Sequence, residues 1–245
     1  MIAFPASFKK ITFQTSILIA LVIFHSNLFA QSAFLLPSNP ARDIADSAAI
    51  HFETLQKRYG NNKEIAPQYE KQIFYALSYF PELANAKIKF KIKNSTKGII
   101  STRPTFGGIF RRSSKRKYLV LIFQPSGPNT IPLFANAGIN GQVGILGHEL
   151  CHIVYFNQKN SLGLIGLGIN HLSTNYMDRF ERRTDSVDIA RGLGYQLMDW
   201  KSYLDKGFRA MRGNDEPARE EFPGGKRYMS VGAIEEQIKN TSIYR

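Results

Sequence analysis

The spacing of hydrophobic residues along the first half of the chain changes from helical to strand-like. It predicts two helices, over residues 45–59 and 67–79. Residues 88–93 alternate between apolar and lysine side chains, which predicts a half-buried strand. A second strand is expected over residues 98–102, and the uniformly apolar run 118–123 is typical of a central strand. We therefore expect a small sheet with two helices before it.

Helical spacing continues through most of the second half. The stretch from Asn140 to Phe156 repeats apolar residues at helical intervals, and Asn140 is a suitable N-cap residue. Gly144 and Gly147 each weaken such a helix by up to ~1 kcal/mol. They either allow a strand or a substrate to approach closely or serve as packing glycines. Further helices are predicted around residues 180–194, 197–204 and 231–239. A small mixed sheet followed by a helical half indicates an α+β fold.

An apolar segment rich in glycine, residues 161–168, lies between two of these helices. Two interpretations are open. The segment forms a flexible wall or lid over a hydrophobic substrate pocket, or it is a buried connecting helix that packs closely on its neighbours.

The N-terminus has the pattern of a secretory signal peptide. Two lysines precede an apolar run at residues 16–24, and Ala30 ends a plausible cleavage site. The run is too short to span a bilayer comfortably. We expect residues 1–30 to be removed and the protein to be exported, to a periplasm or to the medium. An uncleaved N-terminal membrane anchor is the alternative.

The remaining residues, 31–245, are expected to form a single domain, because a chain of this length can bury a sizeable core. Residues 31–59 are either a propeptide or a structural arm. The net charge is +13, and removing a leader with two lysines and no acidic residue leaves +11. This balance favours peripheral contact with an anionic envelope surface. The densest basic run, residues 111–117, has no interleaved aromatic residues, so we expect a solvated hairpin tip and no nucleic-acid partner.

The most specific pattern in the chain is His148-Glu149-Leu150-Cys151-His152. On a helix, His148 and His152 lie one turn apart on the same face, so both imidazoles can bind one metal ion. Glu149 adjoins that face and can accept a proton from a water molecule that the ion activates. Cys151 is the only cysteine, and we expect it to be a small buried core residue.

A catalytic zinc site usually needs a third protein ligand. In a metzincin the third histidine would stand where this chain has Gln158, so that class is excluded. Glu181, Asp185 and Asp188 share one face of a later predicted helix. We expect Glu181 to be the third ligand, and Asp185 to accept a hydrogen bond from a ligand histidine.

Two alternatives to this assignment remain open. The three carboxylates can be a solvated acidic helix face that pairs with neighbouring arginines. His171, the only other histidine between the two motifs, competes with Glu181 as the third ligand. It can also help to bind substrate.

The combination of His148-Glu149-x-x-His152 with Glu181-x-x-x-Asp185 resembles the gluzincin metallopeptidases. Within that clan the chain is similar to small minigluzincin domains and to soluble relatives of CAAX-type peptidases, over about residues 86–194. The resemblance implies a zincin-like fold and one Zn²⁺ held by His148, His152 and Glu181. It also implies Glu149 as general base, Asp185 as the residue that orients a ligand, and an extended peptide held against an edge strand.

Members of the clan also supply a group that stabilises the oxyanion, and Tyr228 is a candidate for it here. The resemblance therefore implies an exported zinc metalloendopeptidase acting on peptides or proteins. One alternative is a zinc-binding envelope protein without activity, in which His171 or Asp188 is a fourth ligand. Hydrolysis of a non-peptide amide or ester is another.

Overall fold

The computed structural model describes residues 40–44, 48–96, 98–127, 132–212 and 227–245. All of them belong to one compact unit, Pro37–Arg245. The predicted leader and its boundary at residue 30 lie outside the described residues. Within the described ranges, no helix combines the length and the apolar character needed to cross a membrane.

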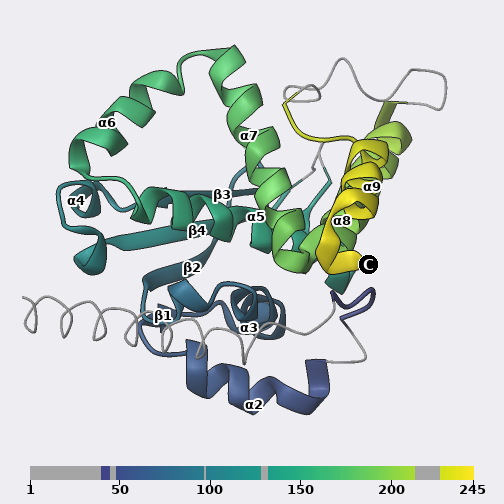
Figure 1. The fold of residues 1–245 in the computed structure, drawn as a ribbon, viewed down its shortest axis with the longest axis horizontal. Coiled ribbons are helices and arrows are strands. Elements are labelled where there is room, and N and C mark those ends of the chain that lie inside the picture. The colour runs from purple at the N-terminus through teal and green to yellow at the C-terminus, as the bar shows by residue number, and fades with distance from the viewer. Residues whose placement is uncertain (1–39, 45–47, 97, 128–131, 213–226) are drawn as a thin grey trace, which may run out of the picture. The chain divides into compact units, whose positions relative to one another are not determined.

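A four-stranded mixed sheet forms one layer of the fold (Figure 1). Its strands lie in the order β1 (Lys63–Glu64), β2 (Lys87–Lys93), β4 (Lys117–Phe123) and β3 (Ile100–Pro104). β2 pairs in parallel with β1 and β4, whereas β3 runs antiparallel to β4. The predicted α+β class is confirmed, and so are the first predicted strand and the central one.

The second predicted strand was placed two residues too early. β3 covers Ile100–Pro104 rather than residues 98–102, and Pro104 pairs with Tyr118. Proline is tolerated here because β3 is at the end of the sheet, where one side of the strand needs no ladder hydrogen bonds. The connection from β3 to β4 contains the short helix α4 (Phe106–Ile109) and a 3-10 turn, Ser113–Lys115.

One face of the sheet packs against helices α3 (Glu70–Ser78) and α5 (Ile139–Asn157). On β2, Lys89 and Lys91 are exposed while Ile88 and Phe90 are buried, as the alternation predicted. The buried cluster joins both layers through Ile73, Leu77, Ile88, Phe90, Val120, Ile122, Val143 and Leu146. The helix α2 (Ala48–Tyr59) packs on α3, which a 3-10 turn at Pro67–Tyr69 precedes. Other short 3-10 turns lie at Pro81–Leu83, Phe134–Asn136 and Ser242–Tyr244.

The N-cap of α5 is Gly138, so the prediction of Asn140 as N-cap is wrong. The Asn140 amide has more distant partners instead. Its oxygen accepts a hydrogen bond from the Ile44 backbone N–H at 3.0 Å, and its nitrogen donates to Arg42 O at 3.1 Å and to Asp199 Oδ2 at 3.0 Å. Asn140 thus joins the segment 40–44 to α5 and to α8 (Gly194–Arg212).

The helical half confirms the remaining helix predictions. After α5, α6 (Ser161–Asn170) leads away from the sheet, and α7 (Thr174–Asp188) returns to α5 (Figure 1). A π-helical turn, Ile189–Leu193, separates α7 from α8, and Gly192 has φ +100° there, a conformation that favours glycine. The last helix is α9 (Val231–Asn240).

The glycines of α5 allow a close helix crossing, which resolves their role in favour of packing. A Cβ at Gly144 would lie 2.3 Å from the backbone carbon of Gln196 on α8, and one at Gly147 would lie 2.4 Å from Asp188 Oδ1. α8 and the end of α7 can therefore approach α5 this closely only because these side chains are absent.

Candidate metal centre

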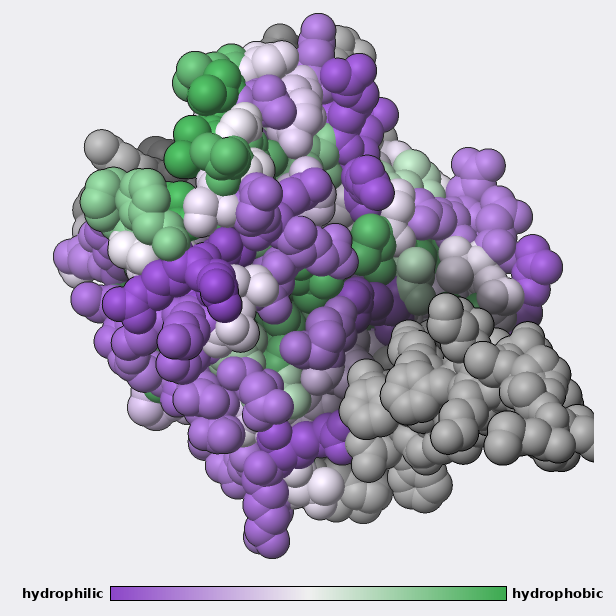
Figure 2. Space-filling view, turned by 60° about the vertical axis from the view of Figure 1, so that its left-hand side comes forward, coloured by the Kyte–Doolittle hydropathy of each residue, from purple (hydrophilic) through white to green (hydrophobic). Residues whose placement is uncertain are grey.

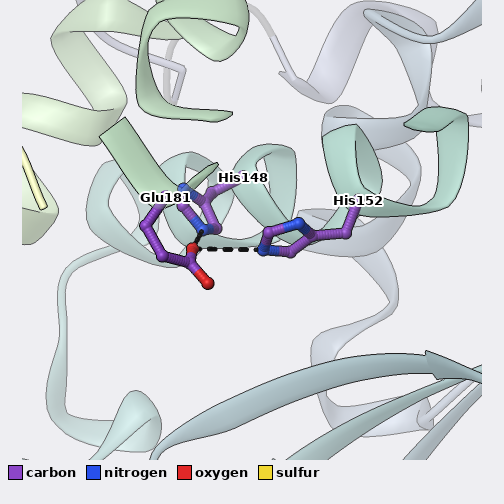
Figure 3. A group of neighbouring side chains, drawn as sticks. All are labelled: His148, His152 and Glu181. Carbon is purple, nitrogen blue, oxygen red and sulfur yellow. Dashed lines mark hydrogen bonds and ion pairs between the residues drawn. The ribbon is translucent and has the colours of Figure 1, made fainter. Parts of the chain in front are cut away.

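Two histidines of α5 and one glutamate of α7 form a buried group (Figure 3). His148 Nε2 lies 3.0 Å from Glu181 Oε2, and His152 Nε2 lies 3.3 Å from the same oxygen. One ligand atom from each residue can be chosen so that all three lie within 4.8 Å of one another. Such a group can hold a metal ion, and it is the one group of this kind among the described residues.

The positions of the three side chains follow from the two helices. Residues 148 and 152 are one turn apart on α5, so their rings point from the same face and meet edge to face, with centroids 4.8 Å apart. α7 packs across that face. Glu181 and Asp185 are one turn apart on α7, so both carboxylates reach the His148 ring, one at each nitrogen.

The second nitrogen of His148 faces Asp185. His148 Nδ1 lies 2.8 Å from Asp185 Oδ1, and both side chains are fully buried. Burial on its own lowers the pKa of His148, but the hydrogen bonds to Asp185 and Glu181 raise it to about 10. A carboxylate in this position fixes the orientation of the imidazole, so Nε2 is directed at the group.

Asp185 is held in place by two further groups. The backbone N–H of Met229 donates a hydrogen bond to Asp185 Oδ2 at 2.8 Å, and Lys201 Nζ lies 3.9 Å from the same oxygen. Burial raises the pKa of Asp185, but Lys201 and His148 outweigh this and lower it below its usual value. Asp185 is therefore an ionised carboxylate with partners on three elements.

Aromatic rings pack against His152, in addition to the carboxylate of Glu181 at its Nε2 atom. Its ring stacks on Phe180 and on Phe156, with centroids 5.1 Å and 6.1 Å away. Its Nδ1 atom is buried without a hydrogen-bond partner.

Burial raises the pKa of Glu181, but the hydrogen bonds from both imidazoles lower it far below its usual value, so this carboxylate is ionised.

Glu149, next to the group in the sequence, carries a buried carboxylate oxygen that has no partner. Glu149 is 6% exposed, and its Oε2 atom makes no hydrogen bond. An unpaired buried carboxylate oxygen is costly, so this atom is a candidate for an interaction with a water molecule or an ion.

Tyr228 lies at the edge of the same group. Its ring centroid is 5.8 Å from that of His148 and 3.9 Å from Lys201 Nζ. Burial and the nearby carboxylates of Glu181 and Glu149 raise the pKa of Tyr228 well above its usual value. The hydroxyl therefore stays protonated and can donate a hydrogen bond.

The other candidate ligands are not part of the group. His171 is an exposed residue at the C-terminal end of α6, with its ring 5.4 Å from that of Phe180. Asp188 is fully buried beside Cys151, whose sulfur lies 4.0 Å from Asp188 Oδ1. Burial raises the pKa of Asp188 well above its usual value. The prediction of Cys151 as a buried core residue is confirmed.

The alternative of a solvated acidic helix face is wrong. Glu181, Asp185 and Asp188 do share one face of α7, but that face is turned into the molecule and all three are buried. The hydrophobic pattern of α7 does not predict that this face is buried, because the helix has few hydrophobic residues and is polar by composition.

Three contributors to the site were not predicted from the sequence. Lys201 is 7% exposed and follows buried Leu197 by one turn of α8, a spacing that could have marked it as inward-facing. Phe180 is the residue before Glu181 and could have been recognised as an aromatic neighbour of the site. The Met229 N–H gave no signal, because a backbone group is the same at every residue.

Two imidazole nitrogens and one carboxylate oxygen form a donor set that suits Zn²⁺ and other divalent transition metals. The geometry supports a metal ion without specifying which one. No family model, curated protein or solved structure matches the chain.

Proposed function

We propose that this chain is an exported, zinc-dependent metallopeptidase with a zincin-like fold of the gluzincin type. One observation carries the proposal. The buried group His148, His152 and Glu181 can hold a metal ion, and Glu149, next to it in the sequence, has a buried carboxylate oxygen without a partner. The proposal of export is based on residues 1–30 alone. Mass spectrometry of the protein recovered outside the cytoplasm shows from its molecular mass whether these residues have been removed.

A three-residue ligand set favours catalysis over a purely structural role. Structural zinc sites are closed by four protein ligands, whereas catalytic sites leave one position for water. Within the described ranges, neither His171 nor Asp188 joins the group, although either would have closed it. This supports the enzyme over the non-catalytic zinc protein.

The side chains of the site have distinct roles in the proposed reaction. A bound zinc ion supplies Lewis-acid chemistry, which acidifies a water molecule and polarises a carbonyl. Glu149 takes the proton of the attacking water and then delivers it to the leaving amine. Asp185 keeps the His148 ring in one orientation. The protonated hydroxyl of Tyr228 donates a hydrogen bond to the oxyanion.

The sheet offers a position for an extended peptide. β3 is an end strand, and it packs next to α5, which carries both histidines. The free edge of such a strand can add a substrate backbone as a further strand. We propose that the peptide lies along this edge with its scissile bond at the metal centre.

The deciding experiment compares the wild-type protein with Glu149→Gln on a diverse peptide library, with and without a chelator, by mass spectrometry. We expect cleavage by the wild type, loss with the chelator, and no cleavage by Glu149→Gln although it still binds zinc. His152→Ala should lose both zinc and cleavage. Glu236→Gln, at an exposed position of α9, is the matched control and should remain active.

Full activity of Glu149→Gln would remove the proposed general base. A wild-type protein that binds one zinc ion and cleaves no peptide would favour the non-catalytic alternative. Cleavage of esters or non-peptide amides alone would keep the metal chemistry and change the substrate.

A further inference from the structure

An exposed hydrophobic surface lies over α4 and α6, which we call the apolar platform. Its members are Phe106, Phe110, Leu162, Ile165, Ile169 and Leu172, which are 44% to 87% exposed. They are six of the eight large hydrophobic residues that the described part of the chain exposes. Figure 2 shows hydrophobic side chains gathered in this region, next to strongly hydrophilic ones. From this surface we infer that the protein docks on an anionic lipid bilayer.

The helix α6 is apolar on both sides. Leu164 and Leu167 face the protein and are buried. The prediction that residues 161–168 form a buried connecting helix is therefore correct for one side of α6 only. Leu162, Ile165 and Ile169 follow one another at helical spacing and face outward. Residues 160–177 contain no Asp, Glu, Lys or Arg. A surface helix in water normally has a polar outer face, whereas a helix lying at a bilayer interface has an apolar one.

The two halves of the platform are joined by a buried arginine. Arg116 is 2% exposed, and its guanidinium donates hydrogen bonds to four backbone carbonyls. On the α4 side it reaches Gly108 O at 3.2 Å and Arg111 O at 2.9 Å, and at the end of α5 it reaches Phe156 O at 2.8 Å and Lys159 O at 3.0 Å. These bonds fix α4 next to the start of α6. The exposed side chains of α4 and α6 therefore belong to one surface with a fixed arrangement.

A cluster of positive charge follows the α4 half of the platform in the sequence. Arg111, Arg112 and Lys115 lie within five residues after Phe110 and are exposed, as the predicted solvated tip required, although Arg116 in the same run is buried. The chain has no acidic residue between Glu82 and Glu149, nor in residues 150–177. A second copy of this chain would bring like charges together at such a surface. Anionic headgroups complement it, and their acyl region accepts the apolar side chains.

The first test measures the charge contribution. Full-length protein is sedimented with vesicles of phosphatidylcholine alone or with one quarter phosphatidylglycerol. We expect binding to the anionic vesicles and little to the neutral ones. Each basic residue near the surface contributes about fivefold, so Arg111→Gln/Arg112→Gln/Lys115→Gln should weaken binding about a hundredfold. The control Arg179→Gln/Arg183→Gln/Arg209→Gln removes the same charge from exposed positions of α7 and α8 and should bind normally.

The second test changes the apolar side chains at constant charge. Leu162→Gln/Ile169→Gln should lower binding to anionic vesicles roughly tenfold or more. Ile139→Gln/Val187→Gln replaces two exposed apolar residues outside the platform and should leave binding unchanged. Every protein carries the same N-terminal residues, so differences between variants report on the platform. Circular dichroism verifies that the variants are folded.

Three outcomes would overturn the inference: unchanged vesicle binding in either platform variant, equal losses in the controls, or a dimer seen by light scattering that Leu162→Gln/Ile169→Gln dissociates. Vesicle binding is measured without substrate, and the Glu149→Gln protein should bind vesicles like the wild type. Failure of this inference therefore leaves the proposed hydrolysis untouched, and the reverse also holds.

Discussion

Asp185 connects the metal centre to parts of the chain that are distant in sequence. Its two oxygens bind His148 on α5 and the Met229 N–H just before α9, and Lys201 on α8 supplies a nearby positive charge. The orientation of His148 thus depends on how α5, α8 and the segment before α9 pack around one buried carboxylate. Partners of this kind tune a metal site although they do not touch the metal.

Replacing Asp185 with Asn should weaken zinc binding roughly 10–100-fold. The amide oxygen can still face His148, but the negative charge is lost and Lys201 loses its counter-charge. Competition with a chromophoric chelator measures the zinc affinity. Asp205→Asn removes a carboxylate from a partly exposed position of α8 and should bind zinc normally. Wild-type affinity in Asp185→Asn would mean that the His148 ring is oriented by other contacts.

The residues of the candidate site differ in how far the sequence predicts them. The spacing of His148, His152, Glu181 and Asp185 encodes their shared helix faces, so local geometry alone brings each pair together. That α7 meets α5 at this face depends on the tertiary fold. Lys201 and the Met229 N–H come from segments whose local pattern carries no metal-binding signature, so only the folded chain reveals them.

Among the elements, the crossing of α5 and α8 depends most strictly on small residues. Gly141, Gly144 and Gly147 recur every third residue on α5, and a Cβ at any of them would lie within 3.3 Å of Trp200, Gln196 or Asp188. Glycine lowers the intrinsic stability of α5. The close approach of α8 and of the end of α7 offsets that loss.

Gly144→Ala should lower the free energy of unfolding by about 2 kcal/mol or more, because its Cβ would meet backbone atoms that cannot rotate away. Gly166→Ala on α6 is the matched control. It has no atom within 4 Å of its Cβ position, so the better helix propensity of alanine should stabilise the protein by up to ~1 kcal/mol. Urea unfolding of both variants measures the difference. Equal effects of the two substitutions would contradict the close crossing.

The elements were predicted well where burial repeats along them and less well where partners are distant. The alternation in β2 reflects one buried face, and the uniformly apolar run of β4 reflects burial on both faces. β1, only two residues long, carries no periodic signal. Asn140 resembled an N-cap because its side chain suits one, but Ile44 and Asp199 are its partners, and neither is near in the sequence. The N-cap propensity of a residue type does not account for hydrogen-bond partners that are distant in the sequence.

For the molecule as a whole, the candidate metal centre is a point where separate parts of the fold are joined. The three candidate ligands come from α5 and α7, and Asp185 adds α8 and the segment before α9 through Lys201 and Met229. An unfolded chain cannot present these groups together. Metal binding should therefore be linked to folding, because an ion that binds only the folded state stabilises it by mass action.

Zinc at about one hundred times its dissociation constant should stabilise the folded protein by about 2.7 kcal/mol. For a chain of this size, that corresponds to a rise in Tm of roughly 5–10 °C. Differential scanning calorimetry measures the shift, and a chelator should reverse it. Glu149→Gln should keep the shift because Glu149 is not one of the three grouped residues, whereas His152→Ala should lose it. A wild-type Tm that does not respond to zinc would mean that the group holds no zinc in the folded protein, and the proposed hydrolysis would lose its basis with it.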